Sequence, residues 1–208
     1  MAGPLSGYRI IEIAGIGPGP FAAMLLADMG AEVVRVERAG AVRGPIPDGP
    51  HFDVLLRGRR NVAIDLKHPD GVEALLTLVE SADALIEGFR PGVVHRLGVD
   101  YDTLRGVNPG LIYCSITGFG QTGPYAHRAG YDYIIQGMSG IMSVTGAPEG
   151  QPQKVGIAVT DILTGLYSVN AILAALHLRQ TTGRGQHIDM GLLDVATAFM
   201  ANQAMNYL

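Results

Sequence analysis

The chain has 208 residues, of which 48% are hydrophobic and 16% are charged, and its mean hydropathy is +0.24. A chain of this kind can bury one sizeable core, which excludes a disordered protein. Its net charge of −4 excludes a basic surface for nucleic acid, and its single cysteine, Cys114, excludes an internal disulfide and predicts a small buried hydrophobe.

The first residues, 1–7, lack the basic and apolar regions of a secretory signal. No continuous apolar run in the chain approaches about 20 residues, the length that spans a membrane. We therefore expect a cytoplasmic protein that binds neither a membrane nor nucleic acid.

The first half of the chain alternates strand signals with helix signals. Strands are predicted at 8–14, 32–37, 61–66, 82–86 and 111–117, and helices at 21–29, 69–80 and 91–97. Residues 39–50, rich in glycine and proline, are a predicted loop. Short connections between alternating strands and helices are typical of parallel βαβ units. The pattern predicts an α/β fold with a parallel sheet covered by helices.

The second half begins with a glycine-punctuated segment at 118–130. Helices are predicted at 131–142, 161–179 and 192–207, a turn-rich loop at 144–153 and a short strand at 186–190. The long helix at 161–179 ends before two glycines at 183 and 185, a residue type that favours helix ends.

The turn at 15–20 joins the first strand to the first helix and resembles part of the dinucleotide-binding fingerprint. Gly15, Gly17 and Glu37 match part of that pattern. However, Pro20 stands where a small residue is needed, and Pro18 removes a backbone N–H that a phosphate would use. NAD binding is therefore disfavoured. The turn either simply connects strand to helix or cradles another nucleotide-like ligand in a different geometry.

Positively charged side chains follow several predicted strands. Arg38, Lys67 and Arg90 lie at or just after strand ends, where parallel sheets bind ligands. Arg96 lies in the helix that follows Arg90. A guanidinium can stack on an adenine ring or bind phosphate through two hydrogen bonds. Each residue alone is an ordinary surface charge, but together they indicate a phosphate-bearing ligand.

Asp161 is a lone acid at the head of the long, almost uncharged helix predicted at 161–179. One interpretation is a helix N-cap, because the free backbone N–H groups and the dipole stabilise an acid there. The other is a nucleophilic carboxylate that forms a mixed anhydride and then a thioester. Residue type and position alone favour the cap.

A series of segments in order resembles the family III CoA-transferases, the group that includes formyl-CoA:oxalate and carnitine CoA-transferases and the α-methylacyl-CoA racemases. The segments are PLSGYRI at 4–10 with the GPGP turn, 25–37, 59–67, EGFRPG at 87–92, TGFGQTGP at 117–124, 131–146, 161–165 and TGRGQHI at 182–188. The resemblance implies that residues 1–208 are a Rossmann-like large domain. Family members are roughly twice as long, with a small domain and a return segment that we do not recognise here, and their chains interlock as homodimers.

By this resemblance, Asp161 is the catalytic nucleophile of a CoA-transferase that moves CoA from an acyl-CoA donor to a carboxylic acid acceptor. The substrates are then an acyl-CoA and a small carboxylic acid, with no tightly bound cofactor and no metal. The resemblance further implies a set of residues that bind CoA or the acyl group: Gly17, Pro18, Arg38, Ile64, Asp65, Leu66, Lys67, Gly88, Phe89, Arg90, Arg96, Tyr131 and Asp132.

Two alternatives stay open at this point. An α-methylacyl-CoA racemase carries histidine in an AGHD context, whereas residues 129–132 read AGYD, and Tyr131 is a poor base because the tyrosine pKa is near 10. His127 is a weak substitute for that histidine. A chain that binds CoA without catalysis is the other alternative. Some transferases have glutamine in place of Gly17, which leaves the acceptor class open, although residues 137–146 resemble relatives that act on dicarboxylic acyl-CoAs such as succinyl-CoA.

Overall fold

The computed structural model describes residues 3–40 and 53–208, so the predicted loop at 39–50 lies mostly outside the described residues. The strands are β1 (Arg9–Ile13), β2 (Glu32–Arg38), β3 (Arg59–Ile64), β4 (Ala84–Glu87), β5 (Ile112–Thr117) and β6 (His187–Gly191). The helices are α1 (Pro18–Asp28), α2 (Pro69–Glu80), α3 (Val93–Arg96), α4 (Tyr101–Val107), α5 (Asp132–Met138), α6 (Val159–Thr182) and α7 (Leu192–Tyr207), with 3-10 turns η1 (Val54–Leu56) and η2 (Ile141–Val144).

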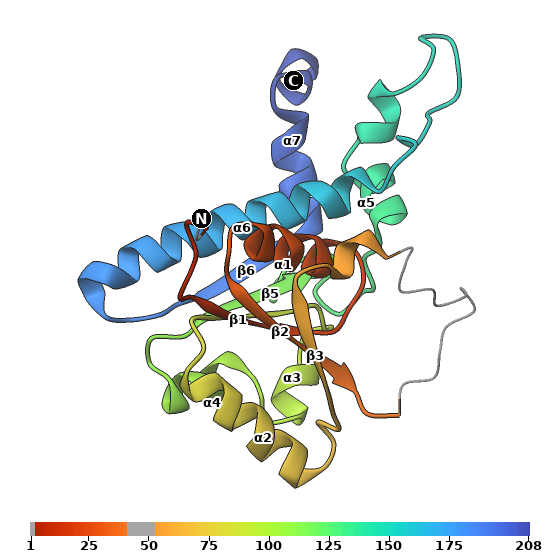
Figure 1. The fold of residues 1–208 in the computed structure, drawn as a ribbon. Helices are drawn as coiled ribbons and strands as arrows, with labels where there is room; N and C mark the ends of the chain where they lie inside the picture. The colour runs from red at the N-terminus through yellow and green to blue at the C-terminus, as the bar shows by residue number, and fades with distance from the viewer. Residues whose placement is uncertain (1–2, 41–52) are drawn as a thin grey trace.

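The strands form one parallel sheet in the order β3-β2-β1-β4-β5-β6. Helices cover both faces, so the predicted α/β, Rossmann-like architecture is confirmed (Figure 1). The chain builds outward from β1 to β3 and then returns to continue from β4 on the other side of β1. Sheets with such a reversal bind ligands at the carboxyl ends of the two central strands, here β1 and β4.

Two separate cores lie on the two faces of the sheet. Neighbouring side chains of a strand point to opposite faces, so Ile86 belongs to the core under α1, α6 and α7, while Leu85 belongs to the core under α2, α3 and α4. Cys114 is fully buried in the first core, and burial raises the pKa of its thiol to about 12. The prediction that Cys114 is a small buried hydrophobe is confirmed.

Helix α6 has 24 residues and runs along the face of the sheet that α1 also covers (Figure 1). By length and composition alone it would be able to cross a membrane, but it lies along the sheet and buries Ile172 and Leu176 in the core. It packs against α1 with little space between the two helices. A β-carbon on Gly165 would lie 2.7 Å from Cδ1 of Phe21 and 3.0 Å from the carbonyl oxygen of Pro18.

Several predicted helix bounds are wrong, each for a local reason. Helix α1 begins at Pro18 rather than Phe21, because proline is favoured in the first helical turn. Helix α3 begins at Val93 rather than at residue 91, since Gly92 has a left-handed backbone. The helix predicted at 131–142 divides at Gly140, where φ is +88°. Helix α4, which was not predicted, begins after Asp100, whose side chain accepts a hydrogen bond from the Thr103 N–H at 3.1 Å.

A buried ion cluster lies between the sheet and the start of α1. Glu12 of β1 is fully buried and pairs with Arg35 of β2 and Arg59 of β3, at 2.5 Å in each case. The Arg59 guanidinium also donates hydrogen bonds to the carbonyl oxygens of Pro20 and Leu55. One carboxylate thus links three strands to the first turn of α1 and to η1.

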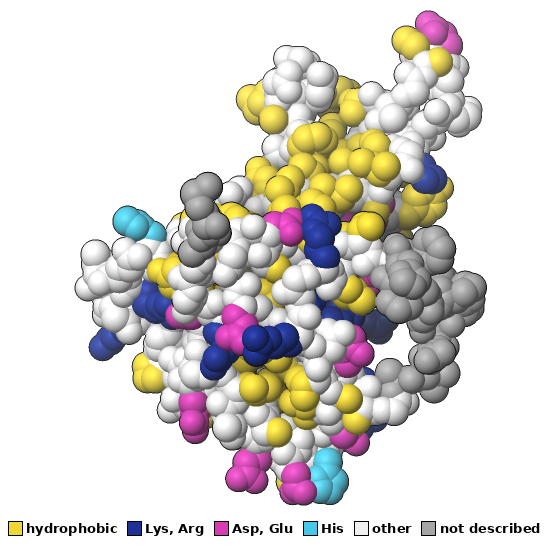
Figure 2. Space-filling model, in the orientation of Figure 1, with side chains coloured by type: hydrophobic (Ala, Val, Ile, Leu, Met, Phe, Trp, Pro, Cys, Tyr) yellow, Lys and Arg dark blue, Asp and Glu magenta, His cyan; other side chains and the backbone are white. Residues whose placement is uncertain are grey.

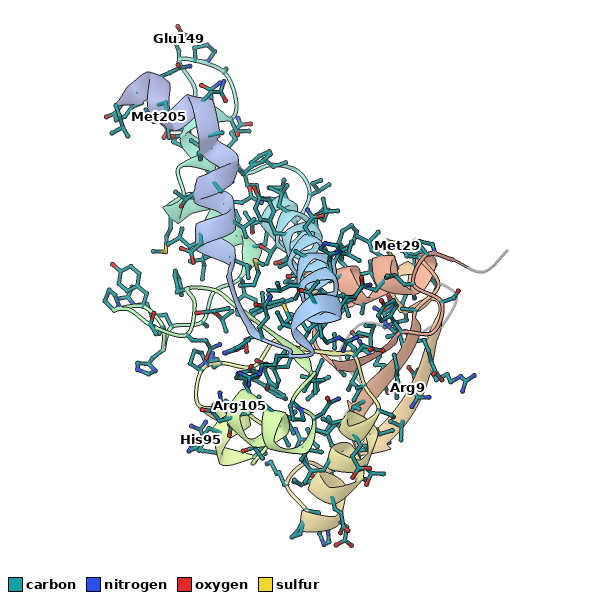
Figure 3. All side chains as sticks on the ribbon, turned by 90° about the vertical axis from the view of Figure 1, so that its left-hand side faces the viewer. Arg9, Met29, His95, Arg105, Glu149 and Met205 are labelled. Atoms are coloured by element: carbon teal, nitrogen blue, oxygen red, sulfur yellow. The ribbon has the colours of Figure 1, made fainter. Side chains whose placement is uncertain are left out.

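Helix α5, the segment that joins it to α6, and helix α7 extend away from the sheet, as a side view shows (Figure 3). There Glu149 and Met205 mark the far end of the molecule, opposite His95 and Arg105 in the layer of α3 and α4. Hydrophobic side chains gather on the surface where this extension begins (Figure 2). Exposed residues of α5, α6 and α7 include Tyr133, Ile134, Met138, Leu166, Tyr167 and Phe199.

Candidate functional site

A cleft of about 330 Å³ opens at the carboxyl edge of the sheet, where β1, β4 and β5 end. It therefore lies at the reversal of strand order, the usual ligand position in such sheets. Four other segments contribute to its wall: the start of α1, residues 128–131, the first turn of α6 and the start of α7 at Leu192. Of the residues predicted from the sequence, the cleft wall contains Pro18, Gly88, Phe89, Arg90, Tyr131 and Asp161.

The turn after β1 lies directly against Asp161. Gly17 has φ of +70°, a conformation that favours glycine. A β-carbon on Gly17 would lie 2.6 Å from Oδ2 of Asp161 and 2.9 Å from its Cγ. A side chain at position 17 would therefore have to displace the carboxylate. Gly17 provides room for Asp161 as well as a tight turn.

The prediction that Asp161 caps its helix is wrong. Helix α6 begins at Val159, its N-cap residue is Ala158, and Asp161 is the third helical residue. Among the described residues, no backbone N–H donates to its carboxylate. The acid does lie in the first turn, where the positive end of the helix dipole favours a negative charge.

Burial dominates the electrostatics of Asp161. Loss of hydration and, to a smaller extent, the negative charge of Asp132 together raise the pKa of its carboxyl to about 6. The helix dipole acts in the opposite sense but does not prevail. At neutral pH the group is therefore mostly ionised, as a nucleophile must be, while only partly hydrated.

Asp132 supplies the cap that α6 lacks. Its Oδ1 accepts hydrogen bonds from the Thr160 N–H at 2.8 Å and from the Thr160 hydroxyl at 2.7 Å. Its Oδ2 accepts from Nε2 of the fully buried Gln136 at 2.7 Å. Asp132 itself does not line the cleft. In the structure it positions the first turn of α6, and so Asp161, from the neighbouring helix α5.

Tyr131 lines the cleft at the N-cap position of α5 rather than inside a helix. Tyr131 is 58% exposed. An exposed ring beside the cleft is available to a ligand. The predicted contact with an acyl-CoA remains a prediction.

Glu87 is a cleft residue that the sequence reasoning did not single out, although it begins the EGFRPG segment. It ends β4 and is 1% exposed, and burial raises the pKa of its carboxyl to about 7. Its Oε2 accepts a hydrogen bond from the Phe89 N–H at 2.7 Å, and the Ser115 hydroxyl acts to lower the pKa of this carboxyl. An acid that ends an otherwise apolar strand was the signal that could have found it.

Thr117 ends β5 and also lines the cleft. Its hydroxyl is buried and has no hydrogen-bond partner among the described residues. A buried hydroxyl without a partner costs free energy unless a ligand or water satisfies it. No local sequence feature distinguishes this threonine from the others.

The remaining predicted residues lie at the same edge of the sheet, beside the cleft rather than in its wall. Arg38 and Ile64 are register partners at the ends of β2 and β3, and Arg38 is exposed. Asp65 Oδ1 accepts a hydrogen bond from the Lys67 N–H at 3.0 Å and so shapes the turn that also contains Leu66. The guanidinium of Arg96 lies against Gly92, 3.3 Å from where a β-carbon would be. Of these residues, none contacts Asp161 in the structure.

In residues 3–40 and 53–208, no three His, Cys, Asp or Glu side chains are grouped so as to hold a metal ion. The cleft instead offers a half-buried carboxylate, a buried carboxyl, a hydroxyl without a partner and two guanidiniums, those of Arg90 and Arg128. This combination suits covalent chemistry at a carboxylate with an anionic ligand.

Residues 5–208 match the family "CoA-transferase family III". The chain is 52% identical to the succinate–glutarate CoA-transferase of Agrobacterium fabrum, over 99% of this chain and 55% of the relative. It is 42% identical to the succinyl-CoA:glutarate CoA-transferase of Mus musculus, over 99% of this chain and 49% of the relative. It is 39% identical to the acetyl-CoA:oxalate CoA-transferase of Acetobacter aceti, over 98% and 54%.

Among solved structures, a CAIB/BAIF family protein from Brucella suis superimposes with a TM-score of 0.94 and 47% identity. The superposition covers 100% of this chain and 58% of that one. The chain thus spans about half the length of the curated relatives it matches.

Proposed function

The chain belongs to CoA-transferase family III, and from this premise we propose that the protein moves CoA from an acyl-CoA donor to a carboxylic acid acceptor, with Asp161 as the nucleophile. The observation that carries the proposal is the Asp161 carboxylate itself. It lies in the cleft, against the Gly17 turn, in the first turn of α6, with its pKa raised to about 6.

The proposed reaction has four steps and consumes no co-reactant. The Asp161 carboxylate attacks the donor thioester, expels the CoA thiolate and forms a mixed anhydride. The thiolate attacks the Asp161 carbonyl of that anhydride, which releases the donor acid and leaves an aspartyl-CoA thioester. The acceptor carboxylate then attacks this thioester to give a second anhydride and the thiolate, which takes the new acyl group and frees Asp161.

The chain provides the means to promote these steps. Each attack places negative charge on an oxygen beside the first turn of α6, where the positive end of the helix dipole favours such charge. Partial burial withholds water from Asp161 and from the anhydride. Asp132 and Thr160 hold the helix start in place, so the nucleophile does not need to be ordered at each turnover.

For CoA, we propose that the thiol arm enters the cleft past Pro18, Gly88 and Phe89, which line it. The nucleotide and its phosphates then lie along the exposed strand ends next to the cleft. Residues proposed to contact them are Arg38, Ile64, Asp65, Leu66, Lys67, Arg90 and Arg96, while Gly17 is proposed to lie beside the thiol arm, next to Asp161. A parallel sheet presents all its carboxyl ends at one edge, which supports a continuous binding path.

For the acids, we propose dicarboxylic substrates, because relatives of this chain are named for succinate, glutarate and oxalate. We further propose a cytoplasmic homodimer. The exposed hydrophobic residues of α5, α6 and α7 support a covered surface, since exposed apolar patches commonly mark interfaces. Sedimentation of the full-length protein would test the dimer.

Trapping at Asp161 tests the mechanism. The full-length protein is incubated with succinyl-CoA and either hydroxylamine or borohydride, and modified peptides are mapped by mass spectrometry. We expect modification at Asp161 and none in Asp161→Asn. Exchange of the α-proton with solvent deuterium in the absence of an adduct would instead indicate an epimerase. Tight CoA binding with neither result would leave a binding protein.

A further inference from the structure

The segment 118–130 forms a closed loop on the wall of the cleft. Its ends touch, because a β-carbon on Gly118 would lie 2.5 Å from the Cα of Gly130, and one on Gly130 would lie 2.4 Å from the Cα of Gly118. The N–H of Gln121 donates to Oδ2 of Asp189 at 2.9 Å, which ties the loop to β6. Ala126 is buried. The loop is therefore anchored at its ends and along its course.

This loop places one cation at the cleft. Arg128 lines the cleft, and its guanidinium carbon lies 4.2 Å from the centre of the Tyr125 ring. The rings of Tyr125 and Phe119 meet edge-to-face, with their centres 5.6 Å apart. The backbone N–H of Arg128 donates to the backbone carbonyl oxygen of Tyr125 at 2.8 Å. Stacking on an aromatic ring restrains a guanidinium while leaving its N–H donors available.

Arg128 carries a positive charge that the described residues do not neutralise. Arg59, Arg57 and Arg179 each pair with a carboxylate, whereas Arg128 forms no ion pair within residues 3–40 and 53–208. An arginine beside a ligand cleft that keeps its donors unpaired is suited to a planar anion such as a carboxylate.

We propose that Arg128 binds the distal carboxylate of a dicarboxylic acyl group or acceptor whose other carboxyl carbon reacts at Asp161. The inference rests on the proposed function and adds the residue that selects dicarboxylic over monocarboxylic acids. The closed loop and the Tyr125 ring, which lies against the guanidinium, fix the position of the Arg128 side chain.

The position of Arg128 favours an acid over a phosphate of CoA. Arg128 and Tyr131 both line the cleft, and because they are three residues apart their Cα atoms are separated by at most about 10 Å. Tyr131 directly precedes Asp132, which holds the start of α6. The acyl end of the ligand must reach Asp161 in this cleft. The phosphates lie at the other end of the long pantetheine arm, towards Arg90 and the cationic residues outside the cleft.

The test compares succinyl-CoA with butyryl-CoA, which has the same number of acyl carbons but no distal carboxylate. In the full-length protein, the succinyl/butyryl ratio is measured both as kcat/KM and as equilibrium Kd. We expect Arg128→Gln to lower both ratios by about 10²-fold, because a charge-assisted pair is lost for one donor only. Arg128→Lys keeps the charge without the two-pronged geometry and should lower the ratios by about tenfold.

Arg105→Gln is the matched control. Arg105 also lies over a tyrosine ring, that of Tyr101 at 5.6 Å, but it belongs to α4 and lies outside the cleft. Its loss should leave both ratios unchanged. Arg90→Gln, in the cleft but proposed to contact CoA, should weaken both donors to a similar extent and so also preserve the ratios.

Unchanged ratios in Arg128→Gln would overturn the inference, and if both donors are weakened equally, Arg128 contacts CoA or has a structural role. Retained binding of butyryl-CoA shows that the variant is folded. The Kd ratio decides the inference even if Asp161 is never labelled. Labelling of Asp161 by butyryl-CoA in the variant would keep the proposed nucleophile intact if Arg128 proves irrelevant.

Discussion

Asp161 and Glu87 are two acids of one cleft, and burial raises the pKa of both carboxyls. Asp161 is half-buried with a pKa of about 6, and Glu87 is almost fully buried with a pKa of about 7. Near pH 7 the first is mostly a carboxylate and the second is divided between carboxyl and carboxylate. Acids with pKa values raised by burial in a cleft are common in catalytic sites.

The first prediction concerns the pH dependence of Asp161 acylation. Only the carboxylate attacks, so the labelling rate should rise about tenfold per pH unit below pH 6 and level off above it. Asp132→Asn removes a negative charge that raises this pKa and should shift the rise to lower pH. The measurement is the initial rate of Asp161 modification between pH 4.5 and pH 8. A rate that stays constant across this range would contradict a titrating carboxylate nucleophile.

The second prediction concerns Glu87 and stability. The pKa of Glu87 in the folded state is about 7, above the ordinary value of 4.5. The folded state therefore keeps this proton bound up to a higher pH than the unfolded state does. The resulting stability is present at low pH and is lost as pH rises from 4.5 through 7. Glu87→Gln, which keeps an acceptor for the Phe89 N–H, should therefore raise the free energy of unfolding at pH 8 by up to about 3 kcal/mol.

At pH 4.5 the same variant should differ by less than about 1 kcal/mol. Urea unfolding at the two pH values measures the change, with the surface variant Glu73→Gln as a control for the loss of a carboxylate. An equal effect of Glu87→Gln at both pH values would show that Glu87 does not carry its proton at neutral pH.

At the scale of elements, the site depends on how closely α1 approaches α6. Gly17 leaves room for Asp161, and Gly165 allows the first turn of α1 to contact α6. Two glycines distant in sequence thus set the same contact between the two helices. Because the starts of α1 and α6 meet there, the turn after β1 lies against Asp161.

The third prediction is that Gly165→Ala lowers the free energy of unfolding by about 1–3 kcal/mol, because its β-carbon meets Phe21 and the carbonyl oxygen of Pro18. It should also slow Asp161 labelling, since the start of α1 must shift. Gly106→Ala in α4 is the control. Its β-carbon meets nothing within 4 Å, and replacing a helical glycine by alanine should stabilise the protein by about 0.5–1 kcal/mol. Equal effects of the two changes would disprove the close contact.

At the scale of the whole molecule, the Glu12 cluster joins the sheet to the segments that border the cleft. The fourth prediction is that Glu12→Gln lowers the free energy of unfolding by about 3–5 kcal/mol, because Arg35 and Arg59 then lose their shared buried carboxylate. Denaturant unfolding measures this.

The comparison for Glu12 is Glu32→Gln, since Glu32 pairs with Arg9 and with the exposed Arg60 at the other edge of the sheet. A solvated pair of this kind is worth at most about 1 kcal/mol. Comparable losses for Glu12 and Glu32 would mean that the buried cluster does not anchor α1.

Local patterns predicted most of the fold. The helix α2 matches its prediction at both ends, and each predicted strand appears within two residues, because alternating apolar positions and turn residues act over short distances. Helix α4 was missed because seven residues give little periodicity. The start of α6 was misplaced because its cap comes from Asp132, an acid 29 positions before Asp161, and no helix signal lies at residue 159 itself.

The candidate site divides in the same way. Asp161, Phe89, Arg90 and Tyr131 were predicted and lie in the cleft wall. Their proposed roles still await the experiments above. Glu87, Thr117 and Arg128 were not predicted. Their side chains become part of one site only because packing brings two strand ends and a closed loop together, and the local sequence does not show this.

The sequence by itself determined the order of strands and helices, the parallel sheet, the family and the acid at the head of the longest helix, since all of these are expressed in residues close together along the chain. Tertiary structure alone decided that the Gly17 turn faces Asp161, that Asp132 rather than Asp161 caps α6, and that the pKa of Asp161 rises. Those properties depend on hydration and on distances between segments far apart in the chain, and only packing sets them.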